Sequence, residues 1–306
     1  MENRNPLKGV ILAGGKGTRL GPLTLGVSKQ LLPLFDKPMI YYPLATLMAA
    51  GIRQVCIIVN SHDLETFVSV LGDGSRFGIS IVYKVQPEPE GIPQALSIAE
   101  EFIGDDDVVL VLGDNLLIGS GLGRSLRNIS SLNGAHIFLY QVENPQDYGN
   151  VKINSEGKIE KIVEKPTQPL SRFAIPGLYF FANSAVEKSK KLKKSPRGEF
   201  EIVDLLNEYL VENTLTFTPL VRGTVWLDTG TPEDLFSAGE YVRIVQKRQG
   251  TQVACLEEIS ILNGWLKLKD LENSTIINQN SHYGKYLRSL IHDGLVFEPL
   301  VQNQNE

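Results

Sequence analysis

A glycine-rich loop with two nearby cations is the first candidate for chemistry. The stretch 12–24, LAGGKGTRLGPLT, follows a short apolar run and contains Arg19, and Lys29 stands shortly after it in GVSKQLLP. Backbone N–H groups of such loops bind phosphate oxygens, and two cations close in sequence suit two phosphates. The pattern therefore favours a polyphosphate site. The glycines alone would fit an exposed turn equally well.

Two standard nucleotide-binding motifs do not fit this loop. The segment 15–20, GKGTRL, begins the dinucleotide pattern G-x-G-x-x-G, but Leu20 stands where the third glycine is required. No window matches the P-loop pattern G-x-x-x-x-G-K-[ST]. The loop is therefore expected to bind phosphate through its backbone and Arg19, without either motif.

Asp114 is the first acidic candidate near this loop. It follows the run VVLVL and one glycine, so it lies at the carboxyl end of a predicted strand, where ligands of open α/β sheets bind. The structural alternative is a turn capped together with Asn115. Asp105, Asp106 and Asp107 match a D-x-D metal motif, but they precede the same strand. We therefore interpret those three residues as a solvated turn.

Apolar strand-like runs alternate with helical patterns through the first half of the chain. Continuous apolar runs are typical of parallel strands covered on both faces. We therefore predict an α/β fold with a mainly parallel, doubly wound, Rossmann-like sheet flanked by helices. The predicted strands are 9–13, 54–59, 80–85, 107–112 and 135–142, and the predicted helices are 38–50, 64–71, 93–102 and 122–132.

The second half has a different pattern, with a smaller β/α extension and a mostly helical end. A hairpin is predicted within 151–166, a strand at 175–183, and helices at 201–212 and 231–250. We expect a core over 1–250, divided near residue 145 into parts 1–145 and 146–250, and a mostly helical C-terminal cap over 251–306. Thr231 followed by proline and two acids predicts the start of the longest helix.

The composition limits the class of protein. The 306 residues carry a net charge of −5 and are 42% hydrophobic, so we expect a folded core and no nucleic-acid or membrane partner. Cys56 and Cys255 lie in apolar runs and are expected to be buried thiols. The four histidines show no zinc spacing. No signal peptide or spanning segment is evident, which predicts a cytoplasmic protein.

Several motifs in one order resemble the sugar-1-phosphate nucleotidyltransferase family. Within that family the pattern is most similar to the glucose-1-phosphate thymidylyltransferases. The glycine loop is followed by SKQLLPLFDKPMIYYPL, LGDN (112–115), YGNVKI (148–153), EKP (164–166), SPRGEFEIVD (195–204), WLDTGTPEDL (226–235) and HYGKYL (282–287).

The resemblance implies a reaction and its cofactor. A nucleotidyl group would pass from a nucleoside triphosphate, dTTP or UTP, to a hexose 1-phosphate, glucose 1-phosphate in the first instance, with release of pyrophosphate. Catalysis would rest on alignment and charge neutralisation with Mg²⁺. A modified amino or deoxy hexose, or a catalytically silent regulatory homologue, are the open alternatives. The resemblance also implies a homo-oligomer, a homotetramer.

The resemblance assigns site residues as well. Taken singly, Lys165 and Arg197 would be solvated side chains and Asp228 a helix cap. By family position the catalytic residues are Arg19, Lys29, Asp114, Lys165 and Asp228, with Asp114 and Asp228 holding Mg²⁺. The nucleotide would contact Leu12, Gly14, Gly15, Gly17, Thr18, Arg19, Gln86, Gly91 and Asp114, and the sugar phosphate would contact Tyr148, Gly149, Glu164, Lys165, Ile175, Arg197 and Trp226.

The Gln86 amide carries both a donor and an acceptor, so it can recognise the N3–H and O4 edge of thymine or uracil. The alternative is a polar residue that ends a strand.

The family pattern is not matched everywhere. Pro93, Pro176 and Asn150 replace the usual residues, the last two in segments expected to line the sugar pocket, and Ser120 replaces a histidine of a separate regulatory site.

Overall fold

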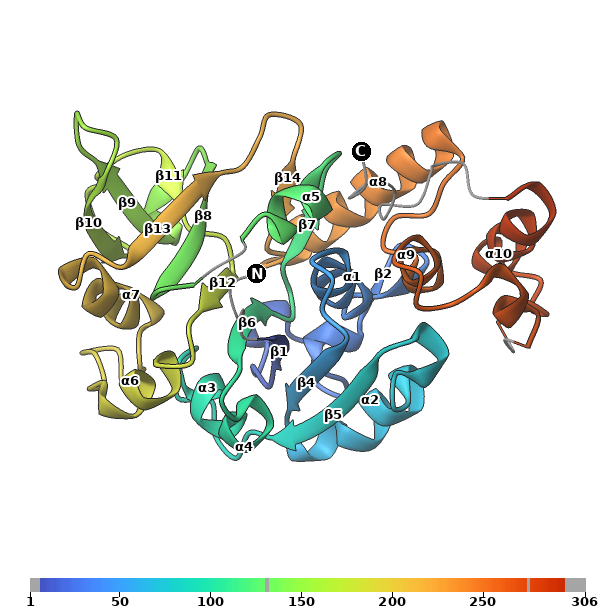
Figure 1. Ribbon diagram of the computed structural model, residues 1–306, viewed down its shortest axis with the longest axis horizontal. Helices are drawn as coiled ribbons and strands as arrows, with labels where there is room; N and C mark the ends of the chain where they lie inside the picture. Colours follow the sequence, from blue (N-terminus) through green and yellow to red (C-terminus); the bar gives the residue numbers. More distant parts are fainter. Residues whose placement is uncertain (1–5, 130–131, 274–275, 295–306) are drawn as a thin grey trace.

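Four of the five strands predicted for the first half of the chain form one side of a ten-stranded mixed sheet, and the fifth, β8, lies in its other half (Figure 1). The computed structural model describes residues 6–129, 132–273 and 276–294. β1 lies between β4 and β6 and pairs with both in parallel, and β5 continues the parallel part beyond β4. β12 then joins β6 in antiparallel orientation and links the sheet to the second half of the chain.

The strand order in this sheet is β10-β9-β11-β8-β12-β6-β1-β4-β5, with β13 paired to β8. Two short ribbons, β2–β3 and β7–β14, lie outside it. The strands are β1 (Leu7–Ala13), β2 (Pro33–Leu34), β3 (Lys37–Pro38), β4 (Gln54–Val59), β5 (Ser80–Val85), β6 (Asp107–Leu112), β7 (Leu116–Ile118), β8 (Ala135–Gln141), β9 (Gly149–Ile153), β10 (Ile159–Glu164), β11 (Phe173–Ala174), β12 (Leu178–Phe181), β13 (Leu215–Pro219) and β14 (Val225–Leu227).

Helices cover both faces of the sheet, as a doubly wound fold requires. One face packs against α1, α2 and α5, and the other against α3, α4, α6 and α7. The helices are α1 (Tyr41–Ala49), α2 (Leu64–Leu71), α3 (Gln94–Ile98), α4 (Glu100–Ile103), α5 (Leu122–Arg127), α6 (Ala185–Lys191), α7 (Ile202–Val211), α8 (Pro232–Gln249), α9 (Leu256–Leu262) and α10 (His282–Asp293).

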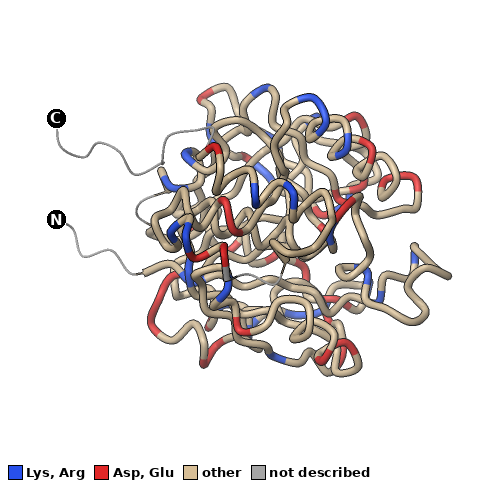
Figure 2. Tube along the Cα trace, turned by 90° about the vertical axis from the view of Figure 1, so that its right-hand side faces the viewer, with Lys and Arg blue, Asp and Glu red and all other residues tan. Residues whose placement is uncertain are grey.

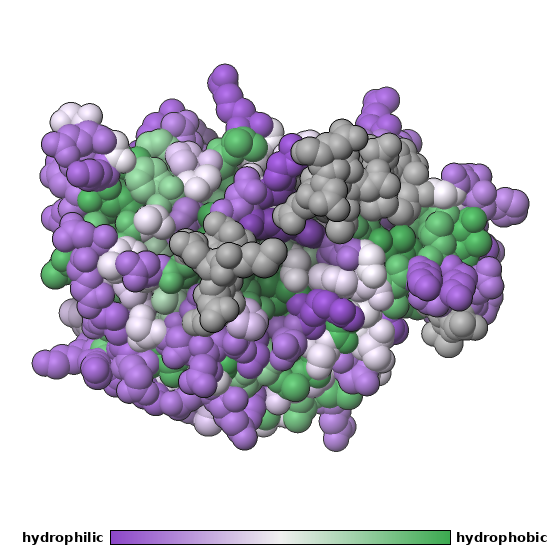
Figure 3. All heavy atoms as spheres, viewed as in Figure 1, coloured by the Kyte–Doolittle hydropathy of each residue, from purple (hydrophilic) through white to green (hydrophobic). Residues whose placement is uncertain are grey.

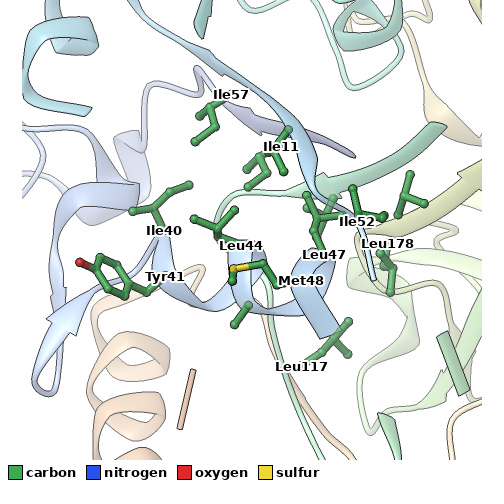
Figure 4. Packing of buried hydrophobic residues seen from close by; sticks show 14 of the residues in the cluster. Ile11, Ile40, Tyr41, Leu44, Leu47, Met48, Ile52, Ile57, Leu117 and Leu178 are labelled. Carbon is green, nitrogen blue, oxygen red and sulfur yellow. The ribbon is translucent and has the colours of Figure 1, made fainter. Parts of the chain in front are cut away.

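Alternate side chains of the central strands enter opposite cores. Ile11 of β1 and Ile57 of β4 belong to the core beneath α1, whereas Val10 and Cys56 belong to the core on the other face. Figure 4 shows α1 side chains, Leu44 among them, directed toward Ile11 and Ile57. Burial on both faces explains why these strands appear in the sequence as continuous apolar runs.

The fold class predicted from the sequence is confirmed, with the qualification that the sheet is mixed. The bounds of β4, β5, β6 and α2 agree with the prediction. The helix predicted at 93–102 is two short helices, α3 and α4, which meet at Ala99. The helix predicted at 122–132 ends at Arg127, and residues 130–131 lie outside the described residues. The prediction missed α6, β13 and the short ribbons.

The predicted start of α8 is present as a full capping box. The Thr231 side chain accepts from the Asp234 backbone, and the Asp234 side chain accepts from the Thr231 backbone. Pro232 occupies the first turn and Gly250 ends the helix at φ 69°. A capping box satisfies backbone donors that the helix itself cannot pair, so the entry to α8 is fixed next to Asp228.

The C-terminal cap packs through buried polar contacts as well as apolar ones. Lys37, 4% exposed, donates to Asp36, Gln246 and Gln252, and Tyr283 of α10 donates to Glu257 of α9. Burial lowers the pKa of Lys37 and raises that of Glu257. The predicted mostly helical character holds for the described part of 251–306, and 295–306 lie outside it.

The surface carries charges of both signs. Figure 2 shows Lys and Arg intermixed with Asp and Glu along the chain, and hydrophilic residues cover most of the face seen in Figure 3. Among the helices of the described residues, none is long and apolar enough to cross a membrane. Intermixed charge does not favour a polyanion-binding face.

We expect stability to fall at mildly acidic pH because of His136 in β8. Its Nδ1 lies 2.8 Å from the Thr216 Oγ1, its Nε2 is buried without a partner in the described residues, and burial lowers its pKa to about 4. The unfolded chain binds the proton near pH 6.5, so stability present above that pH is lost as pH falls toward 4. Between pH 7.5 and pH 5 the loss should be on the order of 2 kcal/mol.

Urea unfolding of the wild type and of His136→Leu at both pH values measures this loss. The variant should lose less stability on acidification, because a packing defect is the same at both pH values. An equal loss in the two proteins would assign the acid sensitivity to other groups.

Candidate active site

A cavity of about 460 Å³ lies where the two halves of the sheet meet. It opens at the carboxyl ends of β1 and β6, the point at which the chain crosses from one side of β1 to the other. Such switch points are where open α/β sheets bind ligands. Residues that line it include Arg19, Ile92, Asp114, Asn115, Tyr148, Gly149, Glu164, Lys165, Ile175, Tyr179, Trp226, Asp228, Thr231 and Asp234.

Lys29 and Asp114 form a partly buried ion pair at this edge. The Lys29 Nζ lies 2.6 Å from the Asp114 Oδ2 and 3.3 Å from the backbone oxygen of Asp228. Lys29 is only 5% exposed. A buried ammonium needs such partners because burial without them is very costly. The pair therefore joins the loop after β1, the end of β6 and the segment before α8.

Asp114 lies close enough to Asp228 to affect the ionisation of Asp228. Burial and then the Asp114 charge raise the pKa of Asp228, and Lys29 partly offsets this. Two carboxylates in one partly buried place are a costly concentration of negative charge. A cation in addition to Lys29 would reduce the repulsion between the two carboxylates.

Asn115 holds three segments of the site together. Its Oδ1 accepts from the Trp226 Nε1 at 2.6 Å and from the Gly177 backbone N–H at 3.0 Å, and its Nδ2 donates to the Asp114 Oδ1 at 3.0 Å. Because both donors can only donate, the amide can face only one way. Asn115 was considered in the sequence only as a turn partner. Its position directly after Asp114, at the carboxyl end of a predicted strand, was the sequence signal that could have identified it as a site residue.

Two residues at the site have a left-handed backbone although they are not glycine. Lys165 has φ 41° and Thr229 has φ 43°. Hydrogen bonds from Lys165 N to Tyr148 O at 3.1 Å and from Thr229 Oγ1 to Asp114 O at 3.0 Å hold them. Such conformations cost on the order of 1–3 kcal/mol each and cluster at functional sites.

A charged group lies on the other side of the cavity. Arg197 Nη1 lies 3.7 Å from the Glu164 Oε1 and 3.5 Å from the Glu201 Oε1. Burial raises the pKa of Glu164, and the Lys165 charge opposes that shift. Arg197 is half-exposed and does not line the cavity. The sequence-predicted group Glu164, Lys165 and Arg197 is therefore assembled at one edge.

Aromatic rings form one wall. The Tyr148 and Trp226 ring centroids are 4.8 Å apart, and those of Tyr140 and Trp226 are 5.8 Å apart. Burial, and then the Asp228 charge, raise the pKa of Tyr148. An apolar wall facing a charged one suits a sugar, which has both apolar faces and hydroxyl groups.

A second cavity of about 280 Å³ lies beside the glycine loop. It is lined by Gly15 and Lys16 of the loop, by His62 and Asp63, and by Gln86. The loop that follows β1 contributes to both cavities, through Arg19 in the larger one and through Gly15 and Lys16 in the smaller one. A two-part ligand, with base and phosphates in different places, would fit such an arrangement.

The glycines serve distinct structural purposes. A Cβ on Gly14 would lie 2.1 Å from the Gln86 Oε1, so only glycine leaves room for that amide. Gly17 has φ 59° and begins the short helical turn that carries Thr18 and Arg19. The lack of a side chain at Gly91 is required by Phe200, whose backbone oxygen would lie 2.1 Å from a Cβ there.

Nine of the residues named from the sequence line the larger cavity. Gln86 and Gly15 line the smaller one, and Leu12 pairs with Gly113 at the end of β1. Leu12, Gly14, Gly17, Thr18, Lys29, Gly91 and Arg197 line neither of these two cavities directly. The nine are Arg19, Asp114, Tyr148, Gly149, Glu164, Lys165, Ile175, Trp226 and Asp228.

Two other sequence interpretations change. Asn150 does not face the cavity: it is fully buried and donates to the backbone oxygens of Ser171 and Phe173. The acidic turn before β6 is not wholly solvated, because Asp106 pairs with Lys8 at 2.9 Å and Asp107 is buried. The turn still lies at the far end of β6 from the site.

The comparisons with known proteins agree with this geometry. Residues 8–243 match the family described as nucleotidyl transferase. The chain belongs to the nucleotidyl transferase family. A glucose-1-phosphate thymidylyltransferase of Neisseria meningitidis serogroup A is 51% identical over 286 residues, which are 93% of this chain and 99% of that protein. One of Mycobacterium tuberculosis H37Rv is 47% identical over 285 residues, with the same coverage of each chain.

Solved structures of nucleotidyl transferases share the fold. A Bacillus anthracis chain described as a glucose-1-phosphate thymidylyltransferase, solved with sucrose, is 38% identical with a TM-score of 0.72, over 78% of this chain and 95% of that one. A UDP-glucose pyrophosphorylase solved with UDP-glucose has a TM-score of 0.69 at 22% identity, over 78% and 99%, and supports the fold alone.

The geometry around Asn115 generates a prediction. Asn115→Asp keeps the acceptor for Trp226 and Gly177 but places a second carboxylate about 3 Å from Asp114, which raises the pKa of the pair. We expect the acid limb of the pH–rate profile to move up by about one unit. Turnover near pH 7 should fall on the order of 10-fold, because the new carboxylate repels Asp114 and removes the hydrogen bond that Asn115 donates to it.

The matched control is Asn150→Asp, the same change at another fully buried asparagine away from the cavity. It should lower the Tm and leave the acid limb in place. Identical pH profiles for wild type and Asn115→Asp would refute the positioning role of Asn115.

Proposed function

We propose that the chain transfers a thymidylyl group from dTTP to glucose 1-phosphate and releases pyrophosphate. The observation that carries the proposal is the convergence of Arg19, Lys29, Asp114 and Asp228 around one cavity at the switch point of the sheet. The names of relatives that cover 93% of this chain support the two substrates.

We propose that the two halves of the sheet bind different substrates. Residues 1–145 supply the nucleotide contacts, residues 146–250 supply the sugar-phosphate contacts, and residues 251–306 form a cap. Arg19 and Lys29 neutralise the triphosphate, and Lys165 and Arg197 hold the phosphate of the sugar. Glu164, which lines the cavity, accepts hydrogen bonds from sugar hydroxyl groups in this proposal.

Magnesium is the proposed cofactor, held by Asp114 and Asp228. Carboxylate oxygens suit Mg²⁺, and the raised pKa of Asp228 beside Asp114 indicates negative charge that a cation would offset. No group of three or more His, Cys, Asp or Glu side chains forms a metal cluster within the described residues. Mg²⁺ sites that use one or two carboxylates complete their coordination with substrate phosphates and water. The ion would supply charge stabilisation at the reacting phosphate.

The chain's own side chains align the reactants. Lys29, already fixed between Asp114 and the Asp228 backbone, offers protons to an incoming phosphate without reorganisation. Arg19 lies beside Gly230, where a Cβ would be 3.2 Å from its Nη1. The sugar-phosphate oxygen attacks the α-phosphorus, the bond to the pyrophosphate breaks, and no covalent protein intermediate is needed.

A homo-oligomer is proposed as the assembly, a tetramer by resemblance. Phe236 and Ile244 lie eight residues apart on α8 and are 68% and 50% exposed. Eight residues place them on one face of the helix. The two buried free cysteines and the nucleotide substrate fit a reducing compartment such as the cytoplasm.

A grid of dTTP, UTP, CTP, ATP and GTP against glucose, galactose and glucosamine 1-phosphates tests the reaction. We expect the fastest pyrophosphate release with dTTP and glucose 1-phosphate. Faster release with an amino sugar would change the substrate but keep the chemistry. If no combination releases pyrophosphate with Mg²⁺ present, the proposed reaction is wrong and a regulatory homologue is the remaining interpretation.

Asp114→Asn and Asp228→Asn test the metal assignment. Each removes one charge, keeps the shape and should lower turnover on the order of 100-fold or more. Mg²⁺ titrations should show a higher half-saturating concentration in both. The control is Asp73→Asn, because this exposed carboxylate accepts hydrogen bonds from Ser75, well away from the cavity. Near wild-type turnover of both site variants at limiting Mg²⁺ would exclude these ligands.

A further inference from the structure

The Gln86 amide is paired at one end and unpaired at the other. Gln86 is 3% exposed, and its Nε2 donates to the Gln94 Oε1 at 2.6 Å. Its Oε1 is buried and has no hydrogen-bond partner among the described residues. This oxygen lies against Gly14 of the glycine loop, and Gln86 borders the cavity of about 280 Å³ beside that loop. A buried acceptor without a partner is destabilising, and a ligand N–H would relieve that cost.

The direction of this amide is determined by groups that cannot reverse their roles. The Gln94 Oε1 accepts from the Glu90 backbone N–H at 3.1 Å, and the Gln94 Nε2 donates to the Glu90 Oε2 at 3.0 Å. A backbone N–H only donates and a carboxylate only accepts, so the Gln94 amide cannot turn over. The atom of Gln86 that faces Gln94 must therefore be its nitrogen.

Glu90 is itself held in place. Its Oε1 lies 2.5 Å from the Lys194 Nζ, and its backbone oxygen accepts from Phe200 N at 2.7 Å. The chain of contacts runs from Lys194 through Glu90 and Gln94 to Gln86. The backbone N–H and the carboxylate of Glu90 fix the direction of the Gln94 amide, and Gln94 in turn fixes which atom of Gln86 is left free.

We propose that Gln94 is a specificity-determining positioning residue: it holds the Gln86 amide so that only an acceptor faces the base. The inference rests on the proposed function and explains how the site would select the base of the nucleotide. Thymine and uracil present an N3–H donor, which an acceptor satisfies. Cytosine presents an unprotonated N3, so two acceptors would face each other. Sites that leave buried polar groups unpaired reject the wrong ligand strongly.

Gln94→Met removes the acceptor at nearly constant volume and frees Gln86 to turn. The ratio of kcat/KM for dTTP over dCTP should fall on the order of 10-fold or more, with KM for dTTP affected more than kcat. A merely structural role would lower kcat/KM equally for both nucleotides.

Ser97→Ala is the matched control, because Ser97 lies in the same helix and its hydroxyl contacts Ser189, 3.1 Å away, and not Gln86. It should leave the ratio unchanged. In the Gln86→Ala background, which itself should relax the ratio, Gln94→Met should have no further effect, since its action passes through Gln86. Additive effects of the two changes, or an unchanged ratio in Gln94→Met, overturn the inference while the proposed function stands.

If the protein proves catalytically silent, the proposed function is wrong, but the role of Gln94 can still be tested through nucleotide binding. Thermal shifts with dTTP and with dCTP would then replace rates. A larger shift with dTTP that is lost in Gln94→Met supports the role of Gln94. Equal shifts in the wild type, or none, overturn it.

Discussion

The ion pair between Lys29 and Asp114 is the interaction on which the site depends. Lys29 is 5% exposed, so its ammonium is stable there only with the Asp114 carboxylate at 2.6 Å and the Asp228 carbonyl at 3.3 Å. A buried charge without its partners would be far more costly than the chain could offset. The loop after β1, the end of β6 and the entry to α8 must therefore meet at one point. The same cation lets two carboxylates approach each other and still leaves negative charge for a metal ion.

The parts of the fold that the sequence predicts are those determined by local pattern. β4, β5 and β6 are continuous apolar runs because both faces are covered, and α8 carries its own capping box and C-terminal glycine. The β7–β14 ribbon could not be predicted, because three-residue strands more than 100 residues apart pair only in the folded context. That ribbon places Trp226 beside Asn115 and so brings Asp228 to Asp114.

The site residues likewise fall into those that a local sequence pattern predicts and those that it does not. Asp114 could be placed at the functional edge because it follows a recognisable strand. The grouping of Glu164, Lys165 and Arg197 had no local signal and depended on resemblance. The left-handed backbone of Lys165 and Thr229 also had none, since neither is glycine. These strained residues are held by the hydrogen bonds that they donate to the backbone oxygens of Tyr148 and Asp114, which lie in other segments. Only the tertiary structure shows that these positions are fixed before substrate arrives.

Two buried amides follow one rule at the two ends of the site. The oxygen of Asn115 faces an indole N–H and a backbone N–H, so its nitrogen must face Asp114. The oxygen of Gln94 faces a backbone N–H, so the nitrogen of Gln86 must face it and the oxygen of Gln86 is left for a ligand. An amide has no preferred direction of its own, and each of these is oriented by partners that can act only one way. Selectivity at the site therefore depends on side chains that need not touch the substrate.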